Sequence, residues 1–117
     1  MNEQSIERRL PLPQAFLHIL IAIGDGERHG YAIMQEVSGR TGGKIRLSPG
    51  TLYGSIRRML DDGLIEELGR RPAHDDDERR RYYRVTRFGR AVAAAETARL
   101  SALVQDARAA GLVPRKA

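Results

Sequence analysis

Residues 48–58 combine the start of a helix with an outer face that carries little bulk. Ser48 is a favourable N-cap residue, and proline is well tolerated at the first helical position that follows it. With Leu52 and Ile56 directed inward, the outer face holds Pro49, Gly50, Tyr53, Gly54 and Arg57, flanked by Thr51, Ser55 and Arg58.

These residue types suit contact with a nucleic acid. Exposed glycines allow close approach, and a capped helix start presents free N–H groups and partial positive charge that favour phosphate. Arg57 can bind a guanine edge with two hydrogen bonds, and Tyr53 can contact a phosphate or a thymine methyl group. The pattern is typical of a helix that enters the major groove of DNA by its N-terminal part. The alternative is an ordinary solvated face, on which Gly50 and Gly54 only lower helix propensity.

A second charged segment covers residues 70–81, with the sequence RRPAHDDDERRR. Its basic ends fit contact with the DNA backbone or the minor groove. Its acidic centre, residues 75–78, does not fit close contact with phosphate. We expect this centre to point away from DNA or to shield the arginines in the free protein. A solvated charged loop is the alternative interpretation.

Other chemistries find weak support. His74 and the three aspartates after it could suggest a metal site, but adjacent carboxylates on a flexible loop lack fixed geometry, and His18 and His29 complete no ligand spacing. The absence of cysteine excludes disulfides and thiol chemistry and fits a reducing cytosol. No nucleophile motif, phosphate-binding glycine loop or rigid carboxylate pair is present. We therefore expect a cytoplasmic protein that is not an enzyme and has no metal or cofactor.

The expected elements that position these residues follow from hydrophobic periodicity. Helices are predicted near residues 14–23, 29–39, 49–62 and 88–110, an edge strand at 44–47, and two strands at 64–68 and 81–86. Three helices followed by a β-hairpin predict a winged helix-turn-helix, a mainly α fold with a small β-hairpin (α+β). We assign residues 1–9 to a flexible N-terminal segment, 10–86 to this domain, 87–110 to a C-terminal helix and 111–117 to a disordered tail.

The first and last predicted helices have more apolar surface than one small domain needs. Apolar residues cover the first helix nearly all round, so it must be buried on more than one side. The last helix is rich in alanine, which lets another helix approach closely. We therefore predict a homodimer, with contacts from Phe16, Leu20, Ile23, Val92, Ala95, Leu100, Leu103 and Val104.

Composition agrees with a nucleic-acid partner. The chain has 117 residues, enough for one domain, and a formal net charge of +5. Such a charge suits a polyanion, although a basic protein without that partner is about equally compatible with it. The longest apolar run, residues 15–23, is too short to cross a bilayer and makes a poor signal peptide after Glu3 and Glu7. We expect no membrane contact.

Four stretches resemble the PadR family of bacterial transcriptional regulators. They are HGYAI at 29–33, LSPGTLY at 47–53, GLI at 63–65 and RRYYRVTRFG at 80–89. The resemblance extends over about residues 12–110, and the second and fourth stretches form a specific pair. The short chain with one C-terminal helix resembles the compact subfamily.

This resemblance implies a homodimer whose C-terminal helix packs on the first helix of the partner. It implies repression of nearby genes through double-stranded DNA with an inverted-repeat operator, and release by a small-molecule effector. Together with the patterns above, it gives these expected DNA-binding residues: Tyr31, Lys44, Ser48, Gly50, Thr51, Tyr53, Gly54, Arg57, Arg58, Arg79, Arg80 and Arg81. Two alternatives stay open, a winged-helix protein-interaction module and a metal-sensing winged-helix regulator.

Overall fold

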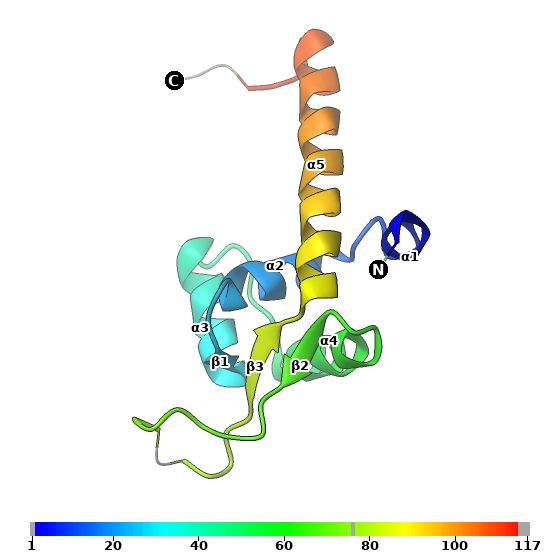
Figure 1. Ribbon diagram of the computed structural model, residues 1–117. Helices are drawn as coiled ribbons and strands as arrows, with labels where there is room; N and C mark the ends of the chain where they lie inside the picture. Colours follow the sequence, from blue (N-terminus) through cyan, green and yellow to red (C-terminus); the bar gives the residue numbers. More distant parts are fainter. Residues whose placement is uncertain (1, 76, 115–117) are drawn as a thin grey trace.

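Helices and a small sheet alternate along the chain in the computed structural model, which describes residues 2–75 and 77–114. The elements are α1 (Glu3–Glu7), α2 (Gln14–Ile23), β1 (Arg28–His29), α3 (Gly30–Arg40), α4 (Pro49–Asp61), β2 (Ile65–Glu67), β3 (Tyr82–Val85) and α5 (Arg87–Ala109). Helices α2 to α4 and the sheet form the body, α5 rises from it, and the loop between β2 and β3 extends from the opposite end (Figure 1). This arrangement confirms the predicted winged helix-turn-helix.

The sheet has the strand order β1-β3-β2, with both pairs antiparallel. Ile65 faces Val85 in the hairpin, and His29 faces Tyr82 across the other pair. The prediction of an edge strand at residues 44–47 was wrong, because the third strand is β1. After α3 the chain turns through Gly42 and Gly43, and the amide of Ile45 donates to the Thr41 hydroxyl at 3.0 Å. This segment therefore bonds to the end of α3 instead of to a strand.

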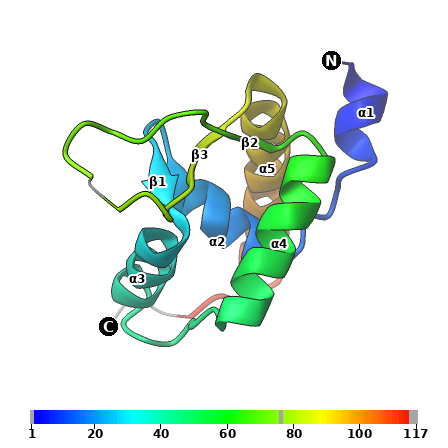
Figure 2. The same cartoon turned by 90° about the horizontal axis from the view of Figure 1, so that it is seen from below.

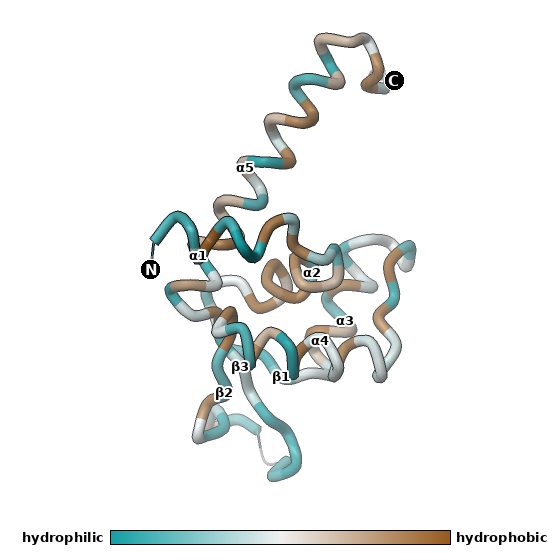
Figure 3. Tube along the Cα trace, turned by 90° about the vertical axis from the view of Figure 1, so that its right-hand side faces the viewer, coloured by the Kyte–Doolittle hydropathy of each residue, from teal (hydrophilic) through white to brown (hydrophobic). Residues whose placement is uncertain are grey.

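Helix α2 is the centre of the core. It contacts α3, α4, α5 and β3, and Figure 2 shows α3 and α4 on either side of it. Figure 3 shows hydrophobic residues gathered in α2 and around it, and hydrophilic residues along the loop after β2. The core includes Phe16, Leu20 and Ile23 of α2 and Val92 of α5.

Burial of these four residues corrects part of the dimer prediction. The exposed fraction of each is 4% or less within the single chain, so none of them offers a surface to a partner. Helical periodicity marked them as apolar and inward-facing, but it does not reveal which body covers them. The first turns of α5 and the body of α2 cover one another.

The junction between α4 and α5 is closely fitted. Gly63, with φ of 75°, ends α4 as predicted, and its carbonyl accepts a hydrogen bond from the Thr86 hydroxyl at 2.5 Å. The same hydroxyl accepts the amide of Gly89 at 2.9 Å and so caps α5. A methyl group at Gly89 would overlap the backbone carbonyl of Leu64. These contacts fix the start of α5 against the end of α4.

The two ends of the chain differ from the expectation in one respect. Residues 3–7, expected to be flexible, form α1, which lies beside α5 and is capped by the Asn2 side chain. Ile6 packs partly buried against the core, and Arg9 pairs with Asp62 at 3.0 Å. At the other end, Gly111 follows α5 with φ of 74°. The remainder of the expected tail, residues 115–117, lies outside the described residues.

Candidate nucleic-acid interface

The start of α4 forms an exposed surface of low bulk. The Ser48 hydroxyl accepts the amide of Thr51 at 3.1 Å, which caps the helix as predicted. A methyl group added at Gly50 or Gly54 would meet no described residue within 4 Å, and Tyr53 is 52% exposed between them. Arg57 is exposed, and no ion pair or hydrogen bond engages its guanidinium among residues 2–75 and 77–114. This face is therefore open to a large partner.

Two residues predicted to border this surface have other roles. The guanidinium of Arg58 lies over the ring of Phe16, with its carbon 5.1 Å from the ring centroid. Ser55 is buried, with 8% of its surface exposed. Arg58 follows Arg57 by about 100° around the helix, which directs it toward α2 and away from the side that carries Arg57. Arg58 remains exposed, so its contact with Phe16 adds a packing role, and its contact with DNA stays a prediction.

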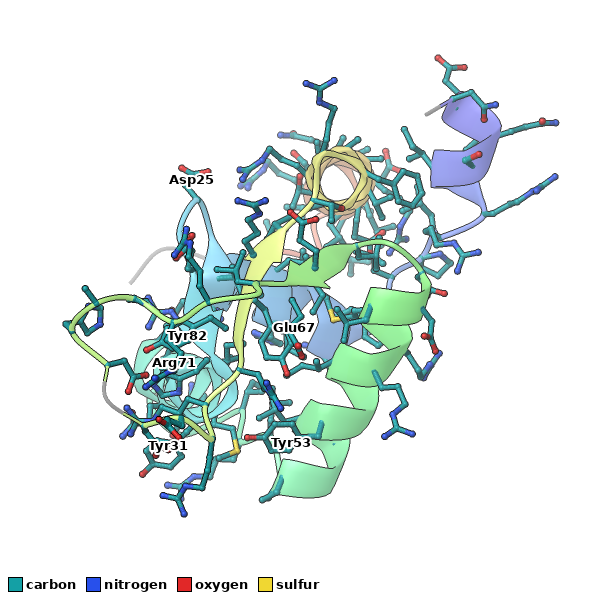
Figure 4. All side chains as sticks on the ribbon, turned by 60° about the horizontal axis from the view of Figure 1, so that its bottom comes forward. Asp25, Tyr31, Tyr53, Glu67, Arg71 and Tyr82 are labelled. Atoms are coloured by element: carbon teal, nitrogen blue, oxygen red, sulfur yellow. The ribbon has the colours of Figure 1, made fainter. Side chains whose placement is uncertain are left out.

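The start of α3 lies beside the start of α4. His29 caps α3, since its Nδ1 accepts the amide of Ala32 at 3.2 Å. Tyr31, in the first turn, is 54% exposed, and Figure 4 shows it on the same side of the molecule as Tyr53. The two helix starts are packed together at Gly30, where the Tyr53 ring covers the bare Cα. Both tyrosines thus extend one continuous surface.

A cleft of about 170 Å³ separates these helix starts from the loop between β2 and β3. We call this loop, residues 68–81, the wing. The cleft is lined by His29, Gly30, Tyr31, Tyr53, Asp77, Arg79, Arg80, Arg81 and Tyr83. The guanidinium groups and phenol hydroxyls in this lining donate hydrogen bonds, and phosphate oxygens accept such bonds. The cleft therefore suits one phosphate group.

The wing carboxylates pair with the wing arginines. Asp77 accepts hydrogen bonds from the backbone amide of Arg79 at 2.9 Å and from its Nε at 3.2 Å, and it lies 3.8 Å from Nε of Arg80. Pairing with Arg79 lowers the pKa of Asp77 to about 2. Of the two expected arrangements for the acidic centre, Asp77 adopts the shielding one. Arg81 and Glu78 are exposed, and Asp76 lies outside the described residues.

Sequence reasoning missed a buried carboxylate in this charged loop. Asp75 is only 8% exposed, and its Oδ2 accepts the Tyr82 hydroxyl at 2.6 Å. Strand alternation placed Tyr82 on the face opposite Tyr83, and an aromatic hydroxyl on that face was the available signal for a polar partner in the adjoining loop. Lys44, another predicted contact, is exposed in the segment between α3 and α4.

A second exposed surface lies on α5 and α2. Leu103 and Val104 are about half exposed, as is Ile21 of α2, and the distal half of α5 extends beyond the body (Figures 1 and 3). Leu100 and Ala95, also predicted dimer residues, are half-buried. Large apolar side chains that stay exposed next to one another, as Leu103 and Val104 do, are candidates for contact with another protein.

A groove of about 410 Å³ lies between α2 and α5. Leu12, Leu17, Ile21 and Leu100 supply its apolar lining, and Gln14, His18, Glu96 and Arg99 its polar groups. The carboxylate of Glu96 is buried and accepts Nε of Arg99 at 2.8 Å. This hydrogen bond lowers the pKa of Glu96 despite its burial.

Neither a metal site nor a membrane-spanning helix is found in the described part of the chain. No three His, Asp or Glu side chains gather there in a way that could hold one metal ion. Nor does any helix within residues 2–75 and 77–114 have the length and apolarity required to span a bilayer.

Comparison with known proteins identifies the relatives of this fold and surface. Residues 19–95 match the Transcriptional regulator PadR-like family. The chain belongs to this family of transcriptional regulators. The resemblance seen in the sequence is thereby confirmed, and the family match includes α3, α4, the wing and the first turns of α5.

Individual relatives of this PadR-like chain cover most of its length. Transcriptional regulator Rv3488 of Mycobacterium tuberculosis is 40% identical over 90 residues, which are 77% of this chain and 78% of the relative. A transcriptional regulator from Clostridium thermocellum superposes with a TM-score of 0.67 at 20% identity, covering 92% of this chain and 95% of that one. RosR of H. salinarum superposes with a TM-score of 0.59 at 22% identity, covering 87% of this chain and 98% of that one. The last two likenesses concern the fold alone.

Proposed function

We propose that this PadR-like regulator binds double-stranded DNA in a sequence-specific way and represses transcription as a homodimer on an inverted-repeat operator. The observation that carries the proposal is the exposed start of α4, where Gly50 and Gly54 leave space and Tyr53 and Arg57 are open to a partner. Family membership supports a regulatory role.

In this proposal α4 enters the major groove with its N-terminal turns. Arg57 reads a base edge, while the hydroxyls of Ser48 and Thr51 and the free amide of Gly50 contact phosphates. Tyr31 and Tyr53 flank the helix, and Lys44 adds a charge near its start. A backbone phosphate occupies the cleft, where Arg79, Arg80 and Arg81 of the wing approach from the other side.

The dimer is proposed to form through the exposed apolar surface of α5. Leu103 and Val104 project beyond the body, where the single chain offers them no cover. The partner would bring the same surface or the α2–α5 groove, with Ala95 and Leu100 at the margin. A two-fold dimer presents two copies of α4 and so requires an operator with two-fold symmetry.

Effector binding is assigned to the α2–α5 groove. Its volume of about 410 Å³ and its apolar lining suit a small molecule of the kind that binding pockets hold. Arg99, whose side chain is 41% exposed, offers a charge for a polar group on that molecule. Because the groove adjoins the proposed dimer surface, effector and DNA would oppose one another reciprocally.

The experiment is a fluorescence anisotropy titration of the protein against the DNA immediately upstream of its own gene, with unrelated DNA as competitor. We expect specific binding that survives the competitor. Nuclease footprinting of the same DNA should then show two half-sites about 10 base pairs apart, or a multiple of that spacing. Tyr53→Ala should weaken binding, whereas Gln105→Ala, an exposed and uncharged change on the face of α5 turned away from Leu103, serves as the control. Equal affinity for all sequences would contradict the proposal.

A further inference from the structure

The carboxylate of Asp75 is the centre of the wing. Its Oδ2 accepts the Tyr82 hydroxyl at 2.6 Å, and its Oδ1 accepts the backbone amide of Asp77 at 2.9 Å and Nη1 of Arg80 at 3.4 Å. Its own backbone carbonyl accepts Nη1 of Arg71 at 2.8 Å. A side chain in a highly charged loop is thus 8% exposed and fully engaged, unlike Asp77, whose partners lie at the surface.

Tyr82 connects this centre to the start of α3. The ring of His29 meets the ring of Tyr82 edge-on, with centroids 5.2 Å apart and planes at 82°. His29 in turn caps α3 by accepting the amide of Ala32. Figure 4 shows Tyr82 and Arg71 together on the wing side of the molecule, with Tyr31 below them. The contacts therefore run without a break from the wing carboxylate to the helix that carries Tyr31.

The wing has few other restraints in its outer part. Residues 70–75 and 77–81 contain no strand, and the backbone bonds described there are the turns closed by the amides of Asp75 and Arg80. Arg70 is held at the base by Glu27 at 3.1 Å. Asp77 pairs with Arg79 and Arg80, but all three residues belong to the wing. Without the Tyr82–Asp75 hydrogen bond, this group would sample many positions relative to the cleft, and DNA binding would have to order it.

We propose that Asp75, held by Tyr82, is a positioning residue for DNA binding, which keeps Arg79 and Arg80 beside the α3–α4 surface before DNA arrives. This inference rests on the proposed DNA-binding function. Asp75 acts through the arginines and does not itself touch DNA. The two neighbouring carboxylates thus have different roles: Asp75 organises the wing, and Asp77 shields the wing arginines.

The test compares Asp75→Asn with Asp77→Asn. Each replaces one carboxylate by an amide and raises the net charge by one, so electrostatics alone predicts tighter DNA binding for both. We expect Asp75→Asn to bind the operator about fivefold more weakly, the order of one lost hydrogen bond, and Asp77→Asn to bind as tightly as the wild type or tighter. Asp106→Asn, on distal α5, controls for the charge. Asp75→Asn binding as tightly as Asp106→Asn would overturn the proposal.

A second pair of variants separates positioning from simple loss of stability. Tyr82→Phe removes the hydroxyl and keeps the ring against His29. It should weaken operator binding and reduce the slope of log Kd against log salt by about one phosphate contact. In an Arg80→Ala background the same change should have a smaller effect, because an arginine that it positions is absent. Fully additive effects with an unchanged salt slope would indicate a structural role alone and refute the inference.

Hydrogen exchange of the free protein provides a readout that does not involve DNA. Tyr82→Phe should speed exchange of the Asp77 amide, which donates to Asp75, while core amides of α2 exchange as in the wild type. Unchanged exchange at Asp77 would count against the positioning role. Failure of the wild type to bind any operator would instead overturn the proposed function, so the two failures are distinguishable.

Discussion

The phenol ring of Tyr53 covers Gly30, and a methyl group added at Gly30 would lie 2.8 Å from the Tyr53 hydroxyl oxygen. One residue belongs to α4 and the other to the first turn of α3, so this contact sets the spacing between two helix starts that form the proposed DNA surface. The absence of a side chain at Gly30 therefore serves the position of Tyr53 rather than backbone freedom.

Gly30→Ala should separate stability from DNA binding. The ring of Tyr53 is partly exposed and can swing away, and alanine is favoured in a helix, so the free energy of unfolding should change by less than about 1 kcal/mol. Operator affinity should fall, because Tyr53 leaves its place. In a Tyr53→Ala background, Gly30→Ala should have no further effect on affinity. Urea unfolding and anisotropy titrations give the two quantities, and a full effect in that background would refute the explanation.

Arg57 and Arg58 provide a matched pair of neighbouring arginines with different surroundings. Arg57→Ala should weaken operator binding by about 1–3 kcal/mol and leave stability within about 0.5 kcal/mol, since no interaction within the described residues engages it. Arg58→Ala should lose about 0.5–1 kcal/mol of stability through its contact with Phe16. Its operator affinity should fall less than that of Arg57→Ala. Equal losses of affinity for both variants would contradict the assignment of α4 faces.

Leu103→Asp tests the proposed dimer surface. Leu103 is 57% exposed, so the chain should fold, but a carboxylate there should be strongly unfavourable in an apolar interface. Analytical ultracentrifugation should show monomers, and affinity for the inverted repeat should drop because two half-sites are no longer linked. As a control, Ala102→Asp places the same charge on the face of α5 turned away from Leu103 and Val104. A dimer that survives Leu103→Asp would exclude this surface.

His29 predicts a pH dependence of stability. Burial, followed by the charge of Arg80, lowers the pKa of His29, and Arg28 lowers it further against the opposing charges of Asp75 and Asp77. The unfolded chain therefore binds a proton more readily than the folded one. Stability is fully present above the ordinary value of about 6.5 and falls as the pH drops below it toward the lowered pKa.

The variant His29→Asn checks this source of pH dependence. Asparagine is a good N-cap and can accept the amide of Ala32, but it has no charge to gain. Urea unfolding at pH 7.5 and at pH 5.5 should show a smaller loss for His29→Asn than for the wild type. An identical loss in both proteins would assign the pH dependence to other groups.

Local signals made part of this structure predictable. Ser48, Gly63 and Thr86 mark helix ends through contacts with residues close in sequence, and all three act as the sequence predicts. Strand β1 could not be found this way, because two residues carry no periodicity. Its existence depends on Tyr82 and Tyr83, more than fifty residues away in the chain.

In the candidate site, too, features set by nearby residues were predictable and features set by distant residues were not. The open face around Tyr53 follows from helical spacing, whereas the fate of Arg58 depends on the ring of Phe16, far away in sequence. The burial of Asp75 likewise depends on Tyr82 across the wing. Periodicity identified apolar faces of the first and last helices, but only the packing of α2 against α5 shows which residues stay available to a partner.

The close fit of Gly89 under Leu64 has a mechanical consequence. Because the chain cannot slide at that point, α5 and the adjoining end of α4 should turn as one body. A 23-residue helix is about 35 Å long, so α5 is a long lever whose fixed start adjoins the C-terminal end of α4, the end opposite the proposed DNA-contacting turns. In the proposed regulator, a small tilt imposed on the distal end of α5 by a partner subunit or a bound molecule would also move the start of α4 and so change its fit to DNA.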